Sequence, residues 1–267
     1  MAIGGFRAEY DRDVALALGR MVETRLLEET DLQKLPLVVQ QYMRLSGAVG
    51  QPMVQNFRAR FHGKIRSGPD ARWMSFAGEQ HNFFDQPSRL FLMDASLFGI
   101  PVQAFHRFVG PSATMRVKIA GLVTMVDAKG PEMDEAETVT LFNDLCVFAP
   151  AALIDPRIQW AQVESRSVRA SYTNGAHTAR ALLSFNDGGE LINFVADGRG
   201  AATAAGKSFT KMPWSTPLRD YRDFGSHRIM TRGEAIWHAP TGDWSYLHFR
   251  VDNIDYNVAG PQLNLTN

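Results

Sequence analysis

The sequence predicts a mainly β protein of the α+β class, built on one large antiparallel sheet that curls into an incomplete barrel, with helices at its N-terminus and one central helix. Three observations predict it. From residue 52 onward, short runs carry an apolar residue at every second position. Gly, Pro, Asn and Asp separate these runs at short intervals, which is typical of hairpins. One long helical pattern, 131–148, interrupts the series.

Residues 1–50 are expected to form a helical segment that packs on the sheet. Within about 9–30, apolar residues such as Val14 and Leu18 recur at the spacing of one helix face, and charged residues fill the other positions. A second helix is predicted after Pro36, which suits a first helical position, and it is expected to end at Gly47.

Residues 51–258 are expected to form the β domain. In 57–66, apolar residues alternate with basic ones, which indicates a half-buried strand with one basic face. Asn174-Gly175 and Asp187-Gly188 predict tight hairpin turns, because those residue types accept a positive φ. The Gly- and Ala-rich stretch 198–207 predicts a flexible loop, and 259–267 a C-terminal tail. The further predicted strands are 72–85, 89–97, 101–109, 114–126, 158–164, 167–173, 177–186, 190–197, 217–224, 227–238 and 244–256.

Composition excludes several classes of function. Lys and Arg together number 28, as do Asp and Glu, so the formal net charge is zero and no nucleic-acid partner is expected. Cys146 is the only cysteine, which excludes an intramolecular disulfide and a cysteine-rich zinc site. No run of eighteen apolar residues predicts a transmembrane segment, and the first residues lack the apolar core of a signal peptide. A soluble cytoplasmic protein is therefore expected.

An ordered series of short strings runs through the chain: Leu35–Tyr42 with Ser46-Gly47, Arg72–Met74 with Glu79-Gln80, Val126–Asp134, Pro150–Leu153, Pro213–Ser215, and Thr231–His238 with Asp255–Asn257. Over roughly 35–257 this series resembles an uncharacterised bacterial family of domains of unknown function. The resemblance implies a LolA-like fold, similar to that of lipoprotein carriers, in which helices cover the concave face of a strongly curved, incomplete barrel. It implies no activity, and therefore no catalytic residues.

Two acidic residues of the 131–148 helix are the leading candidates for chemistry. The acids of its first turn are explained by the helix dipole alone. Glu137 and Asp144 stand seven residues apart and share one face of a helix that is apolar almost all round, which is typical of a buried helix. Such carboxylates are expected to line a pocket, to lie at a wet edge, or to pair with strand arginines. The arginines considered are Arg58, Arg60 and Arg219.

A pocket carboxylate with a raised pKa would serve as a general acid or base. Glu137, Asp144 or Asp127 would take this role, with His81 or His238 as its partner. Glu79 and His81 alternate onto one strand face, but no metal-binding motif is present and no metal site is expected. No phosphate loop, dinucleotide fingerprint or nucleophile elbow occurs, so no cofactor is expected.

Three functions from different classes remain open. The leading hypothesis is binding of an apolar or amphipathic small molecule in a half-barrel cavity beside the 131–148 helix. The second is a cofactor-independent isomerase, cyclase or lyase that uses the same cavity, and the third is a non-catalytic interaction module. Exposed strand edges permit a homodimer without predicting one. The expected cavity walls are Trp73, Phe83, Trp214 and Trp237, and the expected anchors for a polar head are Arg219, Tyr221 and His238.

Overall fold

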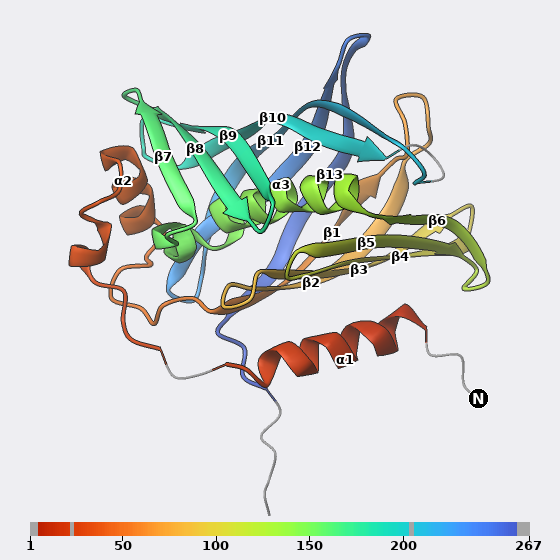
Figure 1. The fold of residues 1–267 in the computed structure, drawn as a ribbon, viewed down its shortest axis with the longest axis horizontal. Coiled ribbons are helices and arrows are strands. Elements are labelled where there is room, and N and C mark those ends of the chain that lie inside the picture. The colour runs from red at the N-terminus through yellow and green to blue at the C-terminus, as the bar shows by residue number, and fades with distance from the viewer. Residues whose placement is uncertain (1–4, 22–23, 203–205, 261–267) are drawn as a thin grey trace, which may run out of the picture.

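A curved antiparallel sheet forms the body of the protein (Figure 1). The structure, a computed structural model, describes residues 5–21, 24–202 and 206–260. Within them the sheet has thirteen strands. They are β1 (Asn56–Ile65), β2 (Met74–Phe83), β3 (Ser88–Leu97), β4 (Ile100–Val109), β5 (Ser112–Ile119), β6 (Val123–Lys129), β7 (Ile158–Val163), β8 (Ser167–Asn174), β9 (His177–Phe185), β10 (Leu191–Ala202), β11 (Phe209–Phe224), β12 (His227–Ala239) and β13 (Gly242–Tyr256).

The sheet consists of two meanders joined side by side. Its strand order is β6-β5-β4-β3-β2-β1-β13-β12-β11-β10-β9-β8-β7, so β1 and β13 form the seam and β6 and β7 the two edges. Every pairing is antiparallel, and within each meander consecutive strands pair with each other. The predicted mainly β architecture is therefore confirmed.

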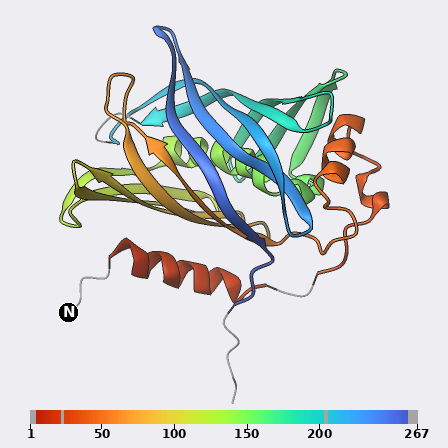
Figure 2. The ribbon, with the colours of Figure 1, turned by 180° about the vertical axis from the view of Figure 1, so that it is seen from behind.

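The helix α3 (Pro131–Phe148) connects the two edge strands and crosses the concave face of the sheet (Figures 1 and 2). It begins after Gly130, whose φ of 100° suits glycine, with Pro131 at the first helical position. Asp134 in the first turn accepts a hydrogen bond from the backbone N–H of Ala113 at 2.6 Å. Fourteen of its eighteen residues are buried, as expected for a helix enclosed by a half-barrel.

The helix α1 (Phe6–Leu18) packs on the opposite face of the sheet, across β3 and β4 (Figure 1). Its buried side chains include Phe6 and Tyr10, which form a second hydrophobic cluster with Phe105 and neighbouring strand residues. At β3 both faces of the sheet are therefore covered, the concave one by α3 and the convex one by α1.

The N-terminal helix is shorter than the predicted 9–30. It ends at Leu18, and Gly19 follows at its C-cap. The backbone beyond Thr24 is extended where Leu26 pairs with Pro52 in an isolated bridge, before a 3₁₀ turn, η1 (Glu29–Leu32). Residues 22 and 23 of the predicted range lie outside the described residues.

The helix α2 (Leu37–Leu45) follows Pro36 as predicted and closes the end of the half-barrel near the C-terminus of α3. The hydroxyl of Tyr42 donates a hydrogen bond to the carbonyl of Cys146 at 2.9 Å, and its ring lies 5.6 Å from that of Phe185. A 3₁₀ turn, η2 (Pro150–Ile154), then leads from α3 into β7.

Two predicted strands and one predicted loop were wrong in their limits. The predicted strand 114–126 is two strands, because Ala120 and Gly121 adopt φ values of 51° and 70° and turn the chain. The stretch predicted as the flexible loop 198–207 continues β10 as far as Ala202, while 203–205 lie outside the described residues. The strand predicted at 217–224 begins at Phe209, because a bulge in β10 accommodates Pro213.

Candidate functional site

Glu137 and Asp144 lie on the face of α3 that meets the sheet, and one arginine binds both. Nε of Arg89, on β3, donates to Oδ2 of Asp144 at 2.8 Å. Nη1 of the same side chain donates to Oε2 of Glu137 at 3.2 Å. All three residues are buried. The predicted common face of the two acids is thus occupied by an ion-pair network.

Two amides of β2 complete the coordination of Asp144. Gln80 and Asn82 donate hydrogen bonds to its Oδ2 at 2.8 and 3.1 Å. Gln80 also accepts a hydrogen bond from Nη2 of Arg89 at 3.0 Å. Every donor in this group comes from neighbouring strands, and every acceptor from α3 or β2. The network therefore fixes the helix to the β2–β3 part of the sheet.

A second arginine reaches Glu137 from the other half of the sheet. Nη2 of Arg199, on β10, lies 3.3 Å from Oε1 of Glu137, and its Nε donates to Oγ1 of Thr140 at 3.0 Å. The guanidinium also stacks over the indoles of Trp214 and Trp237, at 5.0 and 5.3 Å from the ring centroids. Glu137 thus links both meanders through α3.

A β-bulge directs Arg199 toward the helix. Ala196 pairs with Trp214 and Arg199 with Met212, so two residues of β10 stand opposite Pro213 alone. The extra residue shifts the alternation of β10 by one position, which turns Arg199 to the same face as Trp214. Proline is tolerated there because a bulge does not require its missing N–H.

The electrostatics of the network argue against proton transfer by Glu137. Burial of Glu137 opposes its ionisation, but Arg89, His106 and Arg199 outweigh burial and lower its pKa below the usual range. Burial instead raises the pKa of Asp144, in opposition to Arg89 and Asn82. Two arginines balance two carboxylates. The network has the composition of a structural clamp rather than of an acid–base pair.

His106 is the histidine nearest to the two acids. Its Nδ1 is buried without a hydrogen-bond partner and lies 3.6 Å from Oε1 of Glu137. Neither predicted partner, His81 or His238, belongs to this network. Asp127 lies exposed on the edge strand β6, where it stands opposite Arg116. The structure therefore brings together two of the five predicted catalytic residues.

Beside Arg199 the concave face carries an aromatic surface formed by Trp214, Trp237, Trp244 and Tyr246. The rings of Trp237 and Tyr246 stack at 5.6 Å, and Trp244 meets Tyr246 edge-on at 6.2 Å. Nε1 of Trp214 lies 3.2 Å from the hydroxyl of Tyr246. Trp214 and Trp237 are buried, whereas Trp244 and Tyr246 are only half-buried. Two of the predicted wall residues thus lie on one surface.

A row of half-buried aliphatic side chains continues from the aromatic surface toward the hairpin turns between β1 and β2, β3 and β4, and β5 and β6. Strand alternation places them on the concave face. Phe61 faces α3, because its ring stacks on that of Phe148. Ile65 lies four residues further along β1 and therefore points to the same face. Leu247 pairs with Ile65 across the seam. The members of this aliphatic row are Ile65, Met74, Leu97, Ile119 and Leu247.

The other two predicted wall residues lie on the convex side. Phe83 is fully buried in the cluster beneath α1, next to His81, whose Nδ1 lies 2.7 Å from the hydroxyl of Tyr10. Trp73 stacks on His248 at 4.6 Å, on the face opposite to Phe249. These three side chains therefore do not share a surface with Trp214.

The three predicted anchors for a polar head point away from the aromatic surface as well. Arg219 is exposed and pairs with Glu234 at 2.9 Å. The hydroxyl of Tyr221 donates to the carbonyl of Leu191 at 2.8 Å. His238 lies in a hydrogen-bonded series on the convex face: Oγ of Ser215 is 2.8 Å from its Nε2, and Oδ2 of Asp243 is 2.8 Å from its Nδ1.

This Ser–His–Asp order resembles that of a nucleophilic triad, but the serine is enclosed by the sheet. Ser215 is only 3% exposed. A nucleophile must meet its substrate, with donors placed for the developing oxyanion. The geometry shown here supports a structural hydrogen-bond series between three strands.

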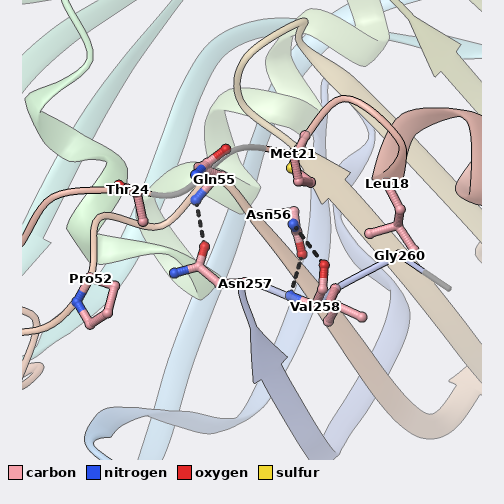
Figure 3. A pocket seen from close by; sticks show the side chains of 10 residues that line it. Leu18, Met21, Thr24, Pro52, Gln55, Asn56, Asn257, Val258 and Gly260 are labelled. Atoms are coloured by element: carbon pink, nitrogen blue, oxygen red, sulfur yellow. Dashed lines mark hydrogen bonds between the residues drawn. The ribbon is translucent and has the colours of Figure 1, made fainter. Parts of the chain in front are cut away.

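None of the predicted wall or anchor residues lines either of two surface cavities that described residues form. The larger, about 460 Å³, lies where the end of α1 meets the start of β1 and the end of β13 (Figure 3). There the side chain of Asn56 donates a hydrogen bond to the carbonyl of Val258 and accepts one from its N–H. The smaller, about 270 Å³, lies beside the β10 bulge and contains the Glu135–Lys211 ion pair.

Within the described part of the chain, no group of three or more His, Cys, Asp and Glu side chains is arranged to hold a metal ion. In the same residues, no helix has the length and apolarity needed to cross a bilayer.

The fold and site define a half-barrel protein in which one helix is fixed across the concave face by a buried ion-pair network, next to an aromatic surface. The chain belongs to a family of unknown function (DUF6544), whose model matches residues 25–249. The predicted membership of an uncharacterised family is thereby confirmed. No protein of curated function matches the chain.

Solved structures with the same general arrangement are distant from this chain. One is a domain assigned as an outer membrane lipoprotein-sorting protein from Vibrio parahaemolyticus, with 8% identity, a TM-score of 0.45, and coverage of 78% of this chain and 87% of that one. A LolA superfamily protein from Nitrosomonas europaea has 7% identity and a TM-score of 0.44, over 82% and 91% of the two chains. A DUF1329 family protein from Desulfovibrio piger has 11% identity and a TM-score of 0.44, over 83% and 92%.

Proposed function

We propose that the protein binds an apolar or amphipathic small molecule on the concave face of its half-barrel, along the aromatic surface and the aliphatic row. One observation carries this proposal. The inner face of a curved sheet normally has a fully buried core, yet Trp244, Tyr246 and all five residues of the aliphatic row remain half-buried. Apolar surface left partly exposed on a concave face is typical of a ligand site.

Arg199 is the proposed polar contact at one end of this surface. Its guanidinium is flanked by two indoles and is already held by Glu137 and Thr140, so its position does not depend on a ligand. A site whose groups are fixed in advance loses less entropy on binding. An amphipathic ligand would place its head near Arg199 and its chain along the aliphatic row.

The physics of this surface predicts how affinity depends on chain length. Each buried methylene contributes about 0.8 kcal/mol, which corresponds to roughly a fourfold gain in affinity. Affinity should therefore rise with each methylene until the row is covered, and then level off. A ligand recognised mainly through its head would show no such slope.

Native mass spectrometry and solvent extraction of the purified protein test the proposal directly. We expect a copurified amphipathic molecule, or binding of a series of alkyl carboxylates with the predicted slope. Trp244→Ala should weaken binding at least about tenfold. Trp73→Ala is the matched control, because its half-buried indole also contacts Arg66 but stacks on His248 and not on Tyr246.

Absence of binding across the alkyl series, or equal losses in the two tryptophan variants, would contradict the proposal. The predicted cytoplasmic location and the homodimer stay predictions.

A further inference from the structure

Five exposed apolar side chains gather on two neighbouring hairpin turns, and we name them the hairpin-tip patch. Phe98 is 75% exposed and Leu122 is 81% exposed, at the β3–β4 and β5–β6 turns. The two turns are joined by a hydrogen bond of 2.8 Å from the N–H of Ala120 to the carbonyl of Pro101. Figure 1 shows both turns at the same end of the sheet. The patch consists of Phe98, Ile100, Leu122, Val123 and Met125.

The turn between β3 and β4 places an aromatic residue where the backbone must have a positive φ, because Phe98 and Gly99 form a two-residue hairpin turn. Phe98 has a φ of 53°, in the left-handed region that glycine and asparagine occupy at lower cost. Its ring nevertheless points away from the hydrophobic core. A bulky apolar residue in a costly conformation, with its ring outside the core, indicates a role outside the folded core.

The charged residues within the two tips and in contact with them are basic, and one acid, Asp70, lies in the neighbouring β1–β2 connection. The segments 96–101 and 118–125 contain no Asp or Glu, and their single charged residue is Lys118. From the β1–β2 connection, the guanidinium of Arg72 lies over the Phe98 ring at 5.1 Å. The tips therefore combine apolar side chains with flanking cations, the composition that binds the headgroup region of an anionic membrane.

We propose that the hairpin-tip patch docks the protein on an anionic lipid surface, with Phe98 and Leu122 inserted between the headgroups. Two protruding turns offer a small convex surface, whereas stable protein interfaces bury about 800 Å² on each partner. Leu97 belongs to the aliphatic row and directly precedes Phe98. The patch therefore lies next to the proposed ligand surface but does not include it.

Vesicle co-sedimentation of the full chain tests this inference. The wild type is expected to sediment with phosphatidylcholine vesicles that contain phosphatidylglycerol, less with pure phosphatidylcholine, and less as salt is raised. The paired variant Phe98→Asn and Leu122→Ser should lose at least about tenfold in partition coefficient. Asparagine tolerates the left-handed backbone, so the fold is expected to persist, as circular dichroism would show.

The matched control replaces Leu16 and Leu37 by serine, because these leucines are 66% and 79% exposed on α1 and α2. It should sediment like the wild type. The inference would be overturned if the wild type did not sediment with anionic vesicles, or if the tip variant sedimented equally well. It would also be overturned if the wild type formed a concentration-dependent dimer that the tip variant did not form. That result would assign the patch to contact with a second copy of the chain. The alkyl-chain titration proposed above depends on Trp244 and not on the hairpin-tip patch. Failure of the ligand-binding proposal can therefore be distinguished from failure of the membrane-docking proposal.

Discussion

Nε of Arg89 lies 2.8 Å from Oδ2 of Asp144, and through this contact strand β3 holds the C-terminal half of α3 against the sheet. The pair is buried from solvent, and the remaining guanidinium nitrogens reach Glu137 and Gln80. Charged hydrogen bonds of this kind are geometrically specific. Arg89 therefore determines how α3 sits across the concave face.

Replacement of Arg89 by methionine should destabilise the protein by about 3–5 kcal/mol, because it leaves two buried carboxylates without their shared cation. Urea unfolding measures the loss. Arg58→Met is the control, since Arg58 pairs with Asp255 on a partly exposed face and should cost at most about 1 kcal/mol. Similar losses in both variants would show that the network does not hold α3.

A separate prediction concerns the stability of the seam between β1 and β13. A Cβ at Gly63 would lie 1.9 Å from the carbonyl oxygen of His248 on β13, so Gly63→Ala forces the two strands apart. We expect a loss above about 4 kcal/mol or failure to fold. Gly68→Ala, with nothing within 4 Å of its added Cβ, should change stability by less than about 0.5 kcal/mol. Thermal unfolding of both variants, compared with the wild type, decides the point.

Stability should fall in acid because of His81. Burial, together with Arg58 and Arg60, lowers the pKa of His81 from 6.5 to about 4. Between these two pKa values, His81 binds a proton in the unfolded chain but not in the folded one. The free energy of unfolding should therefore decrease as the pH falls from 6.5 toward 4, by up to about 3 kcal/mol.

Unfolding free energies measured across this pH range test the contribution of His81. His81→Gln keeps an acceptor for the hydroxyl of Tyr10 but does not titrate, so its stability should depend less on pH. An unchanged pH profile in His81→Gln would assign the acid sensitivity to other groups.

Alternation and turn residues were sufficient to predict the meandering sheet, and the buried character of α3 followed from its apolar surface. The seven-residue spacing of Glu137 and Asp144 also predicted their common face. Their partner Arg89 could not be found in this way. It lies 48 and 55 residues away in sequence, on a strand whose two faces are both apolar because α1 and α3 cover one each.

The same double covering explains why Phe83 was expected on the concave face. Period-two patterns separate the faces of a strand but do not tell which face is inside. Arg199 was missed for another reason. The direction of the Arg199 side chain depends on a one-residue bulge in β10 opposite Pro213. This bulge arises from the pairing of β10 with β11, so the sequence of β10 alone does not indicate it.

Quenching of tryptophan fluorescence by a brominated alkyl carboxylate tests most directly whether an apolar chain lies on the concave aromatic surface. Bromine quenches only the indoles that the chain contacts. We predict saturable quenching that is strongly reduced in Trp244→Phe, while Trp73→Phe, on the opposite face, quenches like the wild type. Unsaturable quenching, or quenching that depends on Trp73 instead, would contradict ligand binding inside the half-barrel.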